Sequence, residues 1–222
     1  IVADHARSTL AADIRLAPGP KLRFGPLTVT GAKRMQAARI VKITGLRQGE
    51  AFSQSELDRA ANRLKRTGVF RSVTLTEADF PVAGDLLPIG VTVVEEKLHR
   101  YSVGAEIASL DGLSLSGYWL HRNLFGGGER LKIDAVSTNI GSGQSGIDYS
   151  LGVTLDRPAT LSPDTTASLS ALIGHQDEVD YAADLAEVGL SFRHYFSEQL
   201  SARVGIAYEY AEGSDPGGKF HF

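Results

Sequence analysis

The chain of 222 residues contains no cysteine, which excludes disulfide scaffolds, thiolate zinc sites and cysteine nucleophiles. No run approaches the roughly 18 consecutive apolar residues of a transmembrane helix, so we expect no such helix. The histidines are equally uninformative about metals, because their spacing never reaches that of a ligand set. They are His5, His99, His121, His175, His194 and His221.

Motifs for catalysis or nucleotide binding are missing or fail in their context. Glycines at 141, 143 and 146 match a dinucleotide fingerprint in spacing. That fingerprint needs a following helix, whereas IDYSLGVTL (147–155) has the periodicity of a strand. No G-x-S-x-G elbow is present. We therefore expect no enzymatic activity, no cofactor, no metal and no nucleic-acid partner.

Charge divides the chain into two parts. Residues 1–100 hold 16 Lys and Arg against 10 Asp and Glu, a net charge of +6. Residues 101–222 hold 7 against 16, a net charge of −9. Such asymmetry predicts two domains in different surroundings, with the boundary near His99.

In the acidic part, apolar residues recur at every second position through seven segments between Tyr101 and Tyr210. A period of two places these side chains on one face of a strand. The segments are about ten residues long, and their other face carries charge, Ser, Thr and Gly. This pattern is typical of an outer-membrane β-barrel. The alternative is a soluble sandwich, whose strands usually run to about 5–6 residues.

The first hundred residues predict a small α+β unit in the order β-α-α-β-β, with two helices on one face of a three-stranded sheet. Ser53 and Glu56 have the spacing of a capping box at the start of the second helix. Glycines at 45 and 68 predict where the helices end. We expect strands over 21–31, 69–78 and 87–97, and helices over about 33–44 and 53–67.

The second helix has two faces of opposite character. On its apolar face, we expect Leu57, Ala61 and Leu64 to bury against strand residues such as Val29, Val73 and Val91. On another face, Arg59, Arg63 and Arg66 form a basic stripe. We interpret this stripe as a solvated helix surface, because surface helices normally carry such charges.

Several phrases resemble a known family. The β-α-α-β-β order, LKRTGVFRSV (64–73) and VTVVEEK (91–97) resemble a POTRA domain, the periplasmic module that precedes the barrel in outer-membrane assembly factors of the BamA/TamA type. HRNLFGGGERL (121–131) is similar to the family's second barrel strand, periplasmic turn and third strand. The short strands and loops after LDRP (155–158) are closer to TamA than to BamA.

The resemblance implies a domain organisation. Residues 1–20 resemble the last strand of a preceding POTRA domain, 21–98 a POTRA domain, and 99–222 the N-terminal part of a transmembrane β-barrel. The expected fold is therefore an α+β POTRA module followed by about seven antiparallel strands of a partial barrel. Since the family's barrels have sixteen strands, the resemblance implies a fragment. It also implies the outer membrane of a Gram-negative bacterium, with the POTRA module in the periplasm.

The implied function is outer-membrane protein assembly. The POTRA module would receive an unfolded client protein, and a lateral seam in the barrel would insert it into the membrane. The alternative is a polypeptide export pore of the two-partner-secretion type; the POTRA module argues against a passive porin. Implied partners are unfolded outer-membrane clients, outer-membrane lipid and, as in TamA-like proteins, an inner-membrane-anchored subunit.

Client binding is expected at two strand edges, because an unpaired edge pairs readily with another chain. The first barrel strand borders the seam and contributes Tyr101, Ser102, Val103, Gly104, Ala105, Glu106 and Ile107. An edge strand of the POTRA module contributes Phe70, Ser72, Val73, Thr74 and Leu75. Outer loops are expected near 110–112, 141–146, 175–180 and after 211, and inner turns at 124–128, 158–164 and 197–199.

Overall fold

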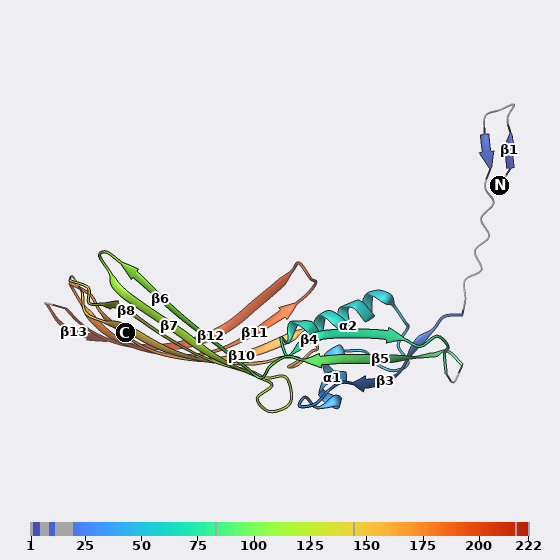
Figure 1. Ribbon diagram of the computed structural model, residues 1–222, viewed down its shortest axis with the longest axis horizontal. Helices are drawn as coiled ribbons and strands as arrows, with labels where there is room; N and C mark the ends of the chain where they lie inside the picture. The colour runs from blue at the N-terminus through green and yellow to red at the C-terminus, as the bar shows by residue number, and fades with distance from the viewer. Residues whose placement is uncertain are drawn as a thin grey trace.

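A computed structural model describes residues 2–4, 9–11, 20–82, 84–143, 145–215 and 217–221. Figure 1 shows a small α+β domain beside one end of a large antiparallel sheet. Two short strands, β1 (Val2–Asp4) and β2 (Thr9–Ala11), pair with each other ahead of the domain. The strand predicted to end a preceding domain within residues 1–20 lies mostly outside the described residues and stays a prediction.

The α+β domain has the element order that the sequence predicts. It consists of β3 (Arg23–Thr30), α1 (Ala37–Thr44), α2 (Gln54–Arg66), β4 (Phe70–Glu77) and β5 (Leu86–Glu95). The sheet order is β3-β5-β4, so β5 is central, parallel to β3 and antiparallel to β4. This order leaves β4 at an edge of the sheet, as expected.

Alternating burial along β5 shows that both helices cover one face of this sheet. Ile89 and Val91 are buried, whereas Thr92 and Val94 are exposed. The core joins this face to both helices, through Phe24, Ile40, Ile43, Leu57, Ala60, Leu64, Val73, Ile89, Val91 and Val93. The predicted burial of Leu57 and Leu64 is confirmed. The prediction for Ala61 is wrong, because the helix turns Ala60 into the core and leaves Ala61 half-buried.

Helix α1 begins at Ala37 rather than near Lys33. The backbone N–H groups of Lys33, Arg34 and Met35 all donate to Oε1 of Glu95, at 2.9, 2.8 and 2.9 Å. These residues therefore wrap around a carboxylate instead of forming a helical turn. Burial alone would raise the pKa of Glu95, but the three N–H donors lower it below its ordinary value.

Helix α2 begins where the sequence predicts, at Ser53, but the capping box is wrong. The Ser53 hydroxyl hydrogen-bonds the Ser55 hydroxyl at 2.7 Å, and no side chain caps the helix. The Glu56 carboxylate instead pairs with Arg59 at 2.8 Å. The Ser53 and Glu56 side chains thus bind other side chains instead of backbone N–H groups. Both helices end at the predicted glycines, whose φ angles are 72° and 66°.

The large sheet contains eight consecutive antiparallel strands. The sequence predicts about seven, and the additional strand is the last. It has four residues and pairs only with the end of its neighbour, so it is too short for a period of two to be visible. The strands are β6 (His99–Ala108), β7 (Gly112–Arg122), β8 (Arg130–Ile140), β9 (Asp148–Arg157), β10 (Thr165–Asp177), β11 (Ala182–Tyr195), β12 (Ser201–Asp215) and β13 (Gly218–His221).

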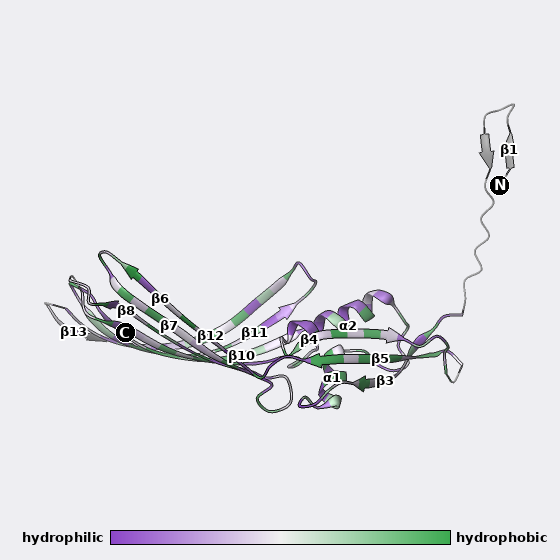
Figure 2. Ribbon diagram, viewed as in Figure 1, coloured by the Kyte–Doolittle hydropathy of each residue, from purple (hydrophilic) through white to green (hydrophobic). Residues whose placement is uncertain are grey.

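The strand register sorts the side chains into an apolar and a polar face, and Figure 2 shows the alternation along the strands. One row of register partners crosses seven strands on the apolar face: Tyr101, Trp119, Ile133, Val153, Ala171, Val188 and Tyr208. The adjacent row, on the polar face, is Ser102, Tyr118, Asp134, Gly152, Leu172, Glu187 and Glu209. The apolar face is open, with Val204 and Ile206 exposed at 71% and 77%. Neither helix in the described part of the chain is long and apolar enough to cross a membrane.

Candidate functional site

The first predicted client-binding strand, β6, ends the large sheet. It pairs with β7 along its whole length, and its other edge faces no further strand among the described residues. Its outward side chains are uncovered: Tyr101, Val103 and Ile107 are exposed at 71%, 88% and 83%. The structure thus places the whole stretch from Tyr101 to Ile107, including Ser102, Gly104, Ala105 and Glu106, on the strand at one edge of the described sheet.

Strand β6 also adheres to its neighbour through small side chains. At Gly104 an added Cβ would come within 2.7 Å of the hydroxyl of its register partner Ser116, so this side chain occupies the space that a larger residue at 104 would need. Ala105 and Ala108 add little further contact area. Since Gly weakens a strand interior, β6 is held less firmly than a Val- or Ile-rich strand would be.

The second predicted strand, β4, is unpaired along one edge within the described chain. Phe70 and Val73 are each only 8% exposed and belong to the core, so only their backbone groups are available to another strand. Ser72 and Thr74 are exposed, and Leu75 is half-buried. Pairing at β4 would therefore rely on main-chain hydrogen bonds more than on side-chain pockets.

The sequence did not predict how the two parts of the chain meet. The turns predicted to be inner turns contact the α+β domain. In the first, the Gln36 N–H donates to the Gly126 carbonyl at 3.0 Å, and Arg39 Nε donates to the Gly127 carbonyl at 2.9 Å. Arg39 Nη2 also donates to the carbonyl of Pro158 in the second turn. Gly126 and its neighbour at 128 have φ angles of 82° and 88°, which the tight turn requires.

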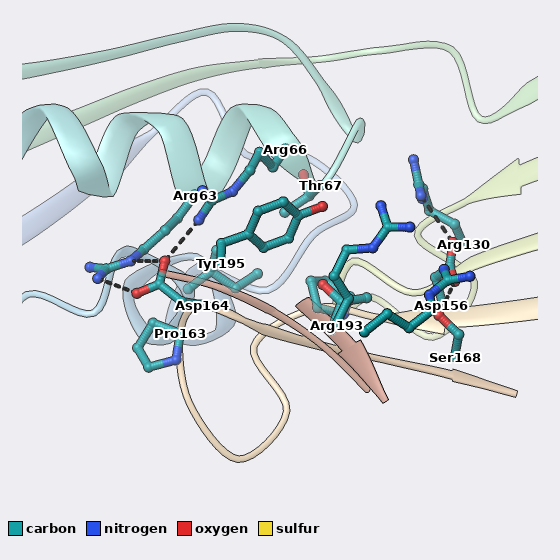
Figure 3. Close-up of a pocket in the computed structure, with 14 residues that line it drawn as sticks. Arg63, Arg66, Thr67, Arg130, Asp156, Pro163, Asp164, Ser168, Arg193 and Tyr195 are labelled. Atoms are coloured by element: carbon teal, nitrogen blue, oxygen red, sulfur yellow. Dashed lines mark hydrogen bonds and ion pairs between the residues drawn. The ribbon is translucent and has the colours of Figure 1, made fainter. Parts of the chain in front are cut away.

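An ion-pair cluster around Asp164 also joins the two parts at this junction, and it is drawn in Figure 3. Arg63 donates to both carboxylate oxygens, from Nε at 2.9 Å and from Nη2 at 2.6 Å, and Arg66 Nη2 donates at 2.8 Å. The Arg66 guanidinium also lies 4.3 Å from the centre of the Tyr195 ring. Burial alone would raise the pKa of Asp164. The two arginines lower this pKa by more than burial raises it, so the pKa of Asp164 is below its ordinary value.

The prediction that Arg59, Arg63 and Arg66 form a solvated stripe is wrong for two of the three. The Arg63 side chain is 8% exposed, and both Arg63 and Arg66 bind Asp164. Only Arg59 remains at the surface, 53% exposed and paired with Glu56. A basic stripe has the same sequence pattern whether it is solvated or contacts an acidic residue about 100 positions further along the chain.

Two other predictions from the sequence concern histidines and glycines. The fold brings His99 and His121 together, with ring centroids 4.8 Å apart, although their spacing in the sequence does not match a ligand set. Trp119 Nε1 donates to His99 Nδ1 at 3.1 Å. Within the described residues, no group of three or more potential ligands could hold a metal. The glycines of 141–146 lie in the connection between β8 and β9, and no helix follows.

Comparison with known proteins supports the resemblance seen in the sequence. Residues 22–96 match the POTRA family, described as a surface antigen variable number repeat. No curated protein matches the chain.

Three solved structures share the fold. BamA from Haemophilus ducreyi, lacking POTRA domains 1–3, matches 89% of the chain with a TM-score of 0.63 and 16% identity. CdiB from Acinetobacter baumannii matches 90% with a TM-score of 0.70 and 12% identity. CdiB from Escherichia coli matches 90% with a TM-score of 0.65 and 13% identity. The matched part is 37%, 40% and 38% of those chains, so this chain spans well under half of their length.

The α+β unit is therefore a POTRA domain. The eight-stranded sheet that follows it has the fold of the matched part of these three structures. The closer likeness to TamA stays a prediction.

Proposed function

We propose that this chain is part of an outer-membrane protein assembly factor in a Gram-negative bacterium. The POTRA domain receives an unfolded client, and the barrel inserts it into the membrane through a seam beside β6. One observation carries this proposal: β6, the edge strand that borders the seam in this proposal, meets β7 through the small residues Gly104, Ala105 and Ala108. Such an edge can pair with a client strand by main-chain hydrogen bonds, with little demand on the client's sequence.

In this proposal the two faces of the sheet and the POTRA domain lie in different environments. Its apolar face contacts outer-membrane lipid and its polar face lines the barrel lumen, as in other membrane barrels. The POTRA domain lies in the periplasm, where the open edge of β4 delivers clients. No step requires a catalytic residue. An inner-membrane-anchored subunit, as in TamA-like proteins, is a further partner that fits this role.

A polypeptide export pore is the second candidate. The POTRA-then-barrel fold serves both kinds of function, and the fold alone does not choose between them. The feature that favours assembly is the Gly and Ala content of β6, because an export pore passes its substrate through the lumen and has no use for a weakly held strand at the seam.

Locking the seam tests the proposal directly. In the full-length protein, a disulfide between Ala105→Cys and a cysteine on the last barrel strand is expected to abolish client insertion while the barrel stays folded. A reductant should restore insertion. The measurement is the rate at which a radiolabelled client becomes folded in proteoliposomes that contain the assembly factor.

The matched control uses the same first-strand cysteine. Ala105 and Leu115 are register partners on β6 and β7, so a disulfide between Ala105→Cys and Leu115→Cys links two strands without closing the seam. This control should insert clients normally. If the seam-locked protein also inserts clients at the normal rate, passage through the lumen becomes the better account.

The membrane topology gives a second expected result. Strand β10 separates the turn at 158–164, which contacts the POTRA domain, from the turn after Asp177. At about 3.3 Å per residue, these turns are roughly 40 Å apart. In intact cells, Asp177→Cys is expected to react with an impermeant maleimide, and Ser162→Cys to react only after the outer membrane is permeabilised. The reverse pattern would invert the proposed orientation.

A further inference from the structure

A small cavity lies between helix α2 and the polar face of the sheet, at the POTRA end of β11 and β12 (Figure 3). Its volume is about 100 Å³. The charged side chains around it are Arg63, Arg66, Arg130, Arg193 and Arg203, with Asp156 and Asp164. Five arginines against two aspartates leave an excess of three positive charges in a confined space.

Both aspartates already bind other groups on each of their oxygens. Asp164 is engaged by Arg63 and Arg66 on both oxygens, as described above. Asp156 accepts from Arg130 Nη2 at 2.9 Å on one oxygen and from the Ser168 hydroxyl at 2.6 Å on the other. Their ion pairs are with Arg63, Arg66 and Arg130, and neither carboxylate forms one with the two remaining arginines.

Those two arginines, Arg193 and Arg203, oppose each other as register partners on β11 and β12. Neither has an ion pair or a side-chain hydrogen bond with any group in the described part of the chain. Like charges directly opposite on neighbouring strands destabilise a sheet. Figure 3 shows the Arg193 side chain between Tyr195 and Arg130, and it is half-buried. Within the described residues these two opposed guanidinium groups have no counter-ion, and such a pair has the donors that an anionic ligand needs.

The size and position of the cavity restrict that anion. A volume of about 100 Å³ has room for one small oxyanion, since one water occupies about 30 Å³ of liquid. The cavity opens on the polar face of the sheet, opposite the apolar side chains, so a lipid headgroup on the outer face does not reach it. Planar guanidinium groups bind carboxylates through paired N–H donors.

We propose that Arg193 and Arg203 bind a single carboxylate carried by a polypeptide segment that passes between the POTRA domain and the barrel. This proposal rests on the proposed function only in that a client polypeptide is present in this space. It adds a preference: segments with an acidic side chain are held at the entrance to the lumen.

Binding to a matched pair of peptides tests this inference. The intact protein, folded in detergent micelles, is titrated with a flexible Gly/Ser peptide that contains one Glu, blocked termini and an uncharged fluorophore. The same peptide with Gln is the comparison. By fluorescence anisotropy, we expect the Glu peptide to bind at least ten times more tightly, and the double variant Arg193→Gln/Arg203→Gln to lose this preference.

The double variant Lys132→Gln/Arg157→Gln is the control, since it removes two positive charges from side chains outside the cavity and should keep the preference. Equal binding of the Glu and Gln peptides, with inorganic phosphate bound instead, would overturn the proposal in favour of a small-anion site. So would a fall in Tm for Arg193→Gln/Arg203→Gln with the preference retained, because it would give these arginines a structural role. Neither outcome bears on seam opening, which the disulfide test measures separately.

Discussion

Asp164→Ala is expected to free the POTRA domain from its fixed position against the barrel. The substitution removes both acceptors of Arg63 and the acceptor of Arg66. Arg63, with its side chain 8% exposed, would keep only the Thr44 carbonyl, at 2.7 Å from Nη1. Truncating one partner of a buried charged pair typically costs about 2–5 kcal/mol, largely because the other charge stays buried without compensation.

Distances between spin labels measure this effect. Labels at exposed Gln48 in the POTRA domain and Asp111 at the far end of β6 can be placed in a chain without native cysteine. We expect a narrow distance distribution in the wild type and a broad one in Asp164→Ala. Asp58→Ala removes an exposed carboxylate from α2, the helix that carries Arg63 and Arg66, and should leave the distribution narrow. A narrow distribution in Asp164→Ala would mean that the remaining contacts, among them those of Arg39 with Gly127 and Pro158, hold the domain without Asp164.

The pH dependence of the same distribution follows from the depressed pKa of Asp164. A carboxyl whose pKa is lower in the folded state contributes stability above its unfolded value of 3.8, and loses it as the pH falls through the folded pKa. The junction should therefore be unchanged between pH 7 and pH 5 and should loosen only well below pH 3.8. Asp164→Ala should lack this acid step.

Leu64→Ala is expected to lower the free energy of unfolding of the POTRA domain by about 2–5 kcal/mol, the usual cost for a buried leucine. Leu64 is 0% exposed and joins α2 to the sheet core that contains Val73 and Val91. The loss combines the transfer of apolar area back to water with the cavity that the smaller side chain leaves.

Circular dichroism at 222 nm follows this domain selectively, because α1 and α2 are the helices of the described chain. Denaturant titration of this signal gives the free energy of unfolding. Lys65→Ala, at the exposed neighbouring position, should change it by less than about 0.5 kcal/mol. A cost of that small size for Leu64→Ala would contradict the helix register, since only surface positions are so tolerant.

The sequence by itself determined the elements and their order. A period of two is enforced wherever one face of a strand is buried or meets lipid, so the strands from Tyr101 onward could be read directly. The C-terminal ends of both helices could also be predicted from the local sequence, because a glycine at positive φ ends a helix through its own backbone conformation. The β4 and β6 edges followed from the order of elements in a resembling family. The sequence did not predict the short β13, because four residues are too few to show a period of two.

Only the tertiary structure shows which group each charged side chain binds. Glu95 lies about 60 positions from the N–H groups it accepts, and Asp164 lies about 100 positions from Arg63 and Arg66. Nothing near Arg193 in the sequence shows that Arg203 will face it. Local patterns report which side of an element is polar, because that depends on residues three or four apart in a helix and two apart in a strand. They cannot report which polar group lies opposite, since an ion pair depends on distance in space, which only the folded chain fixes.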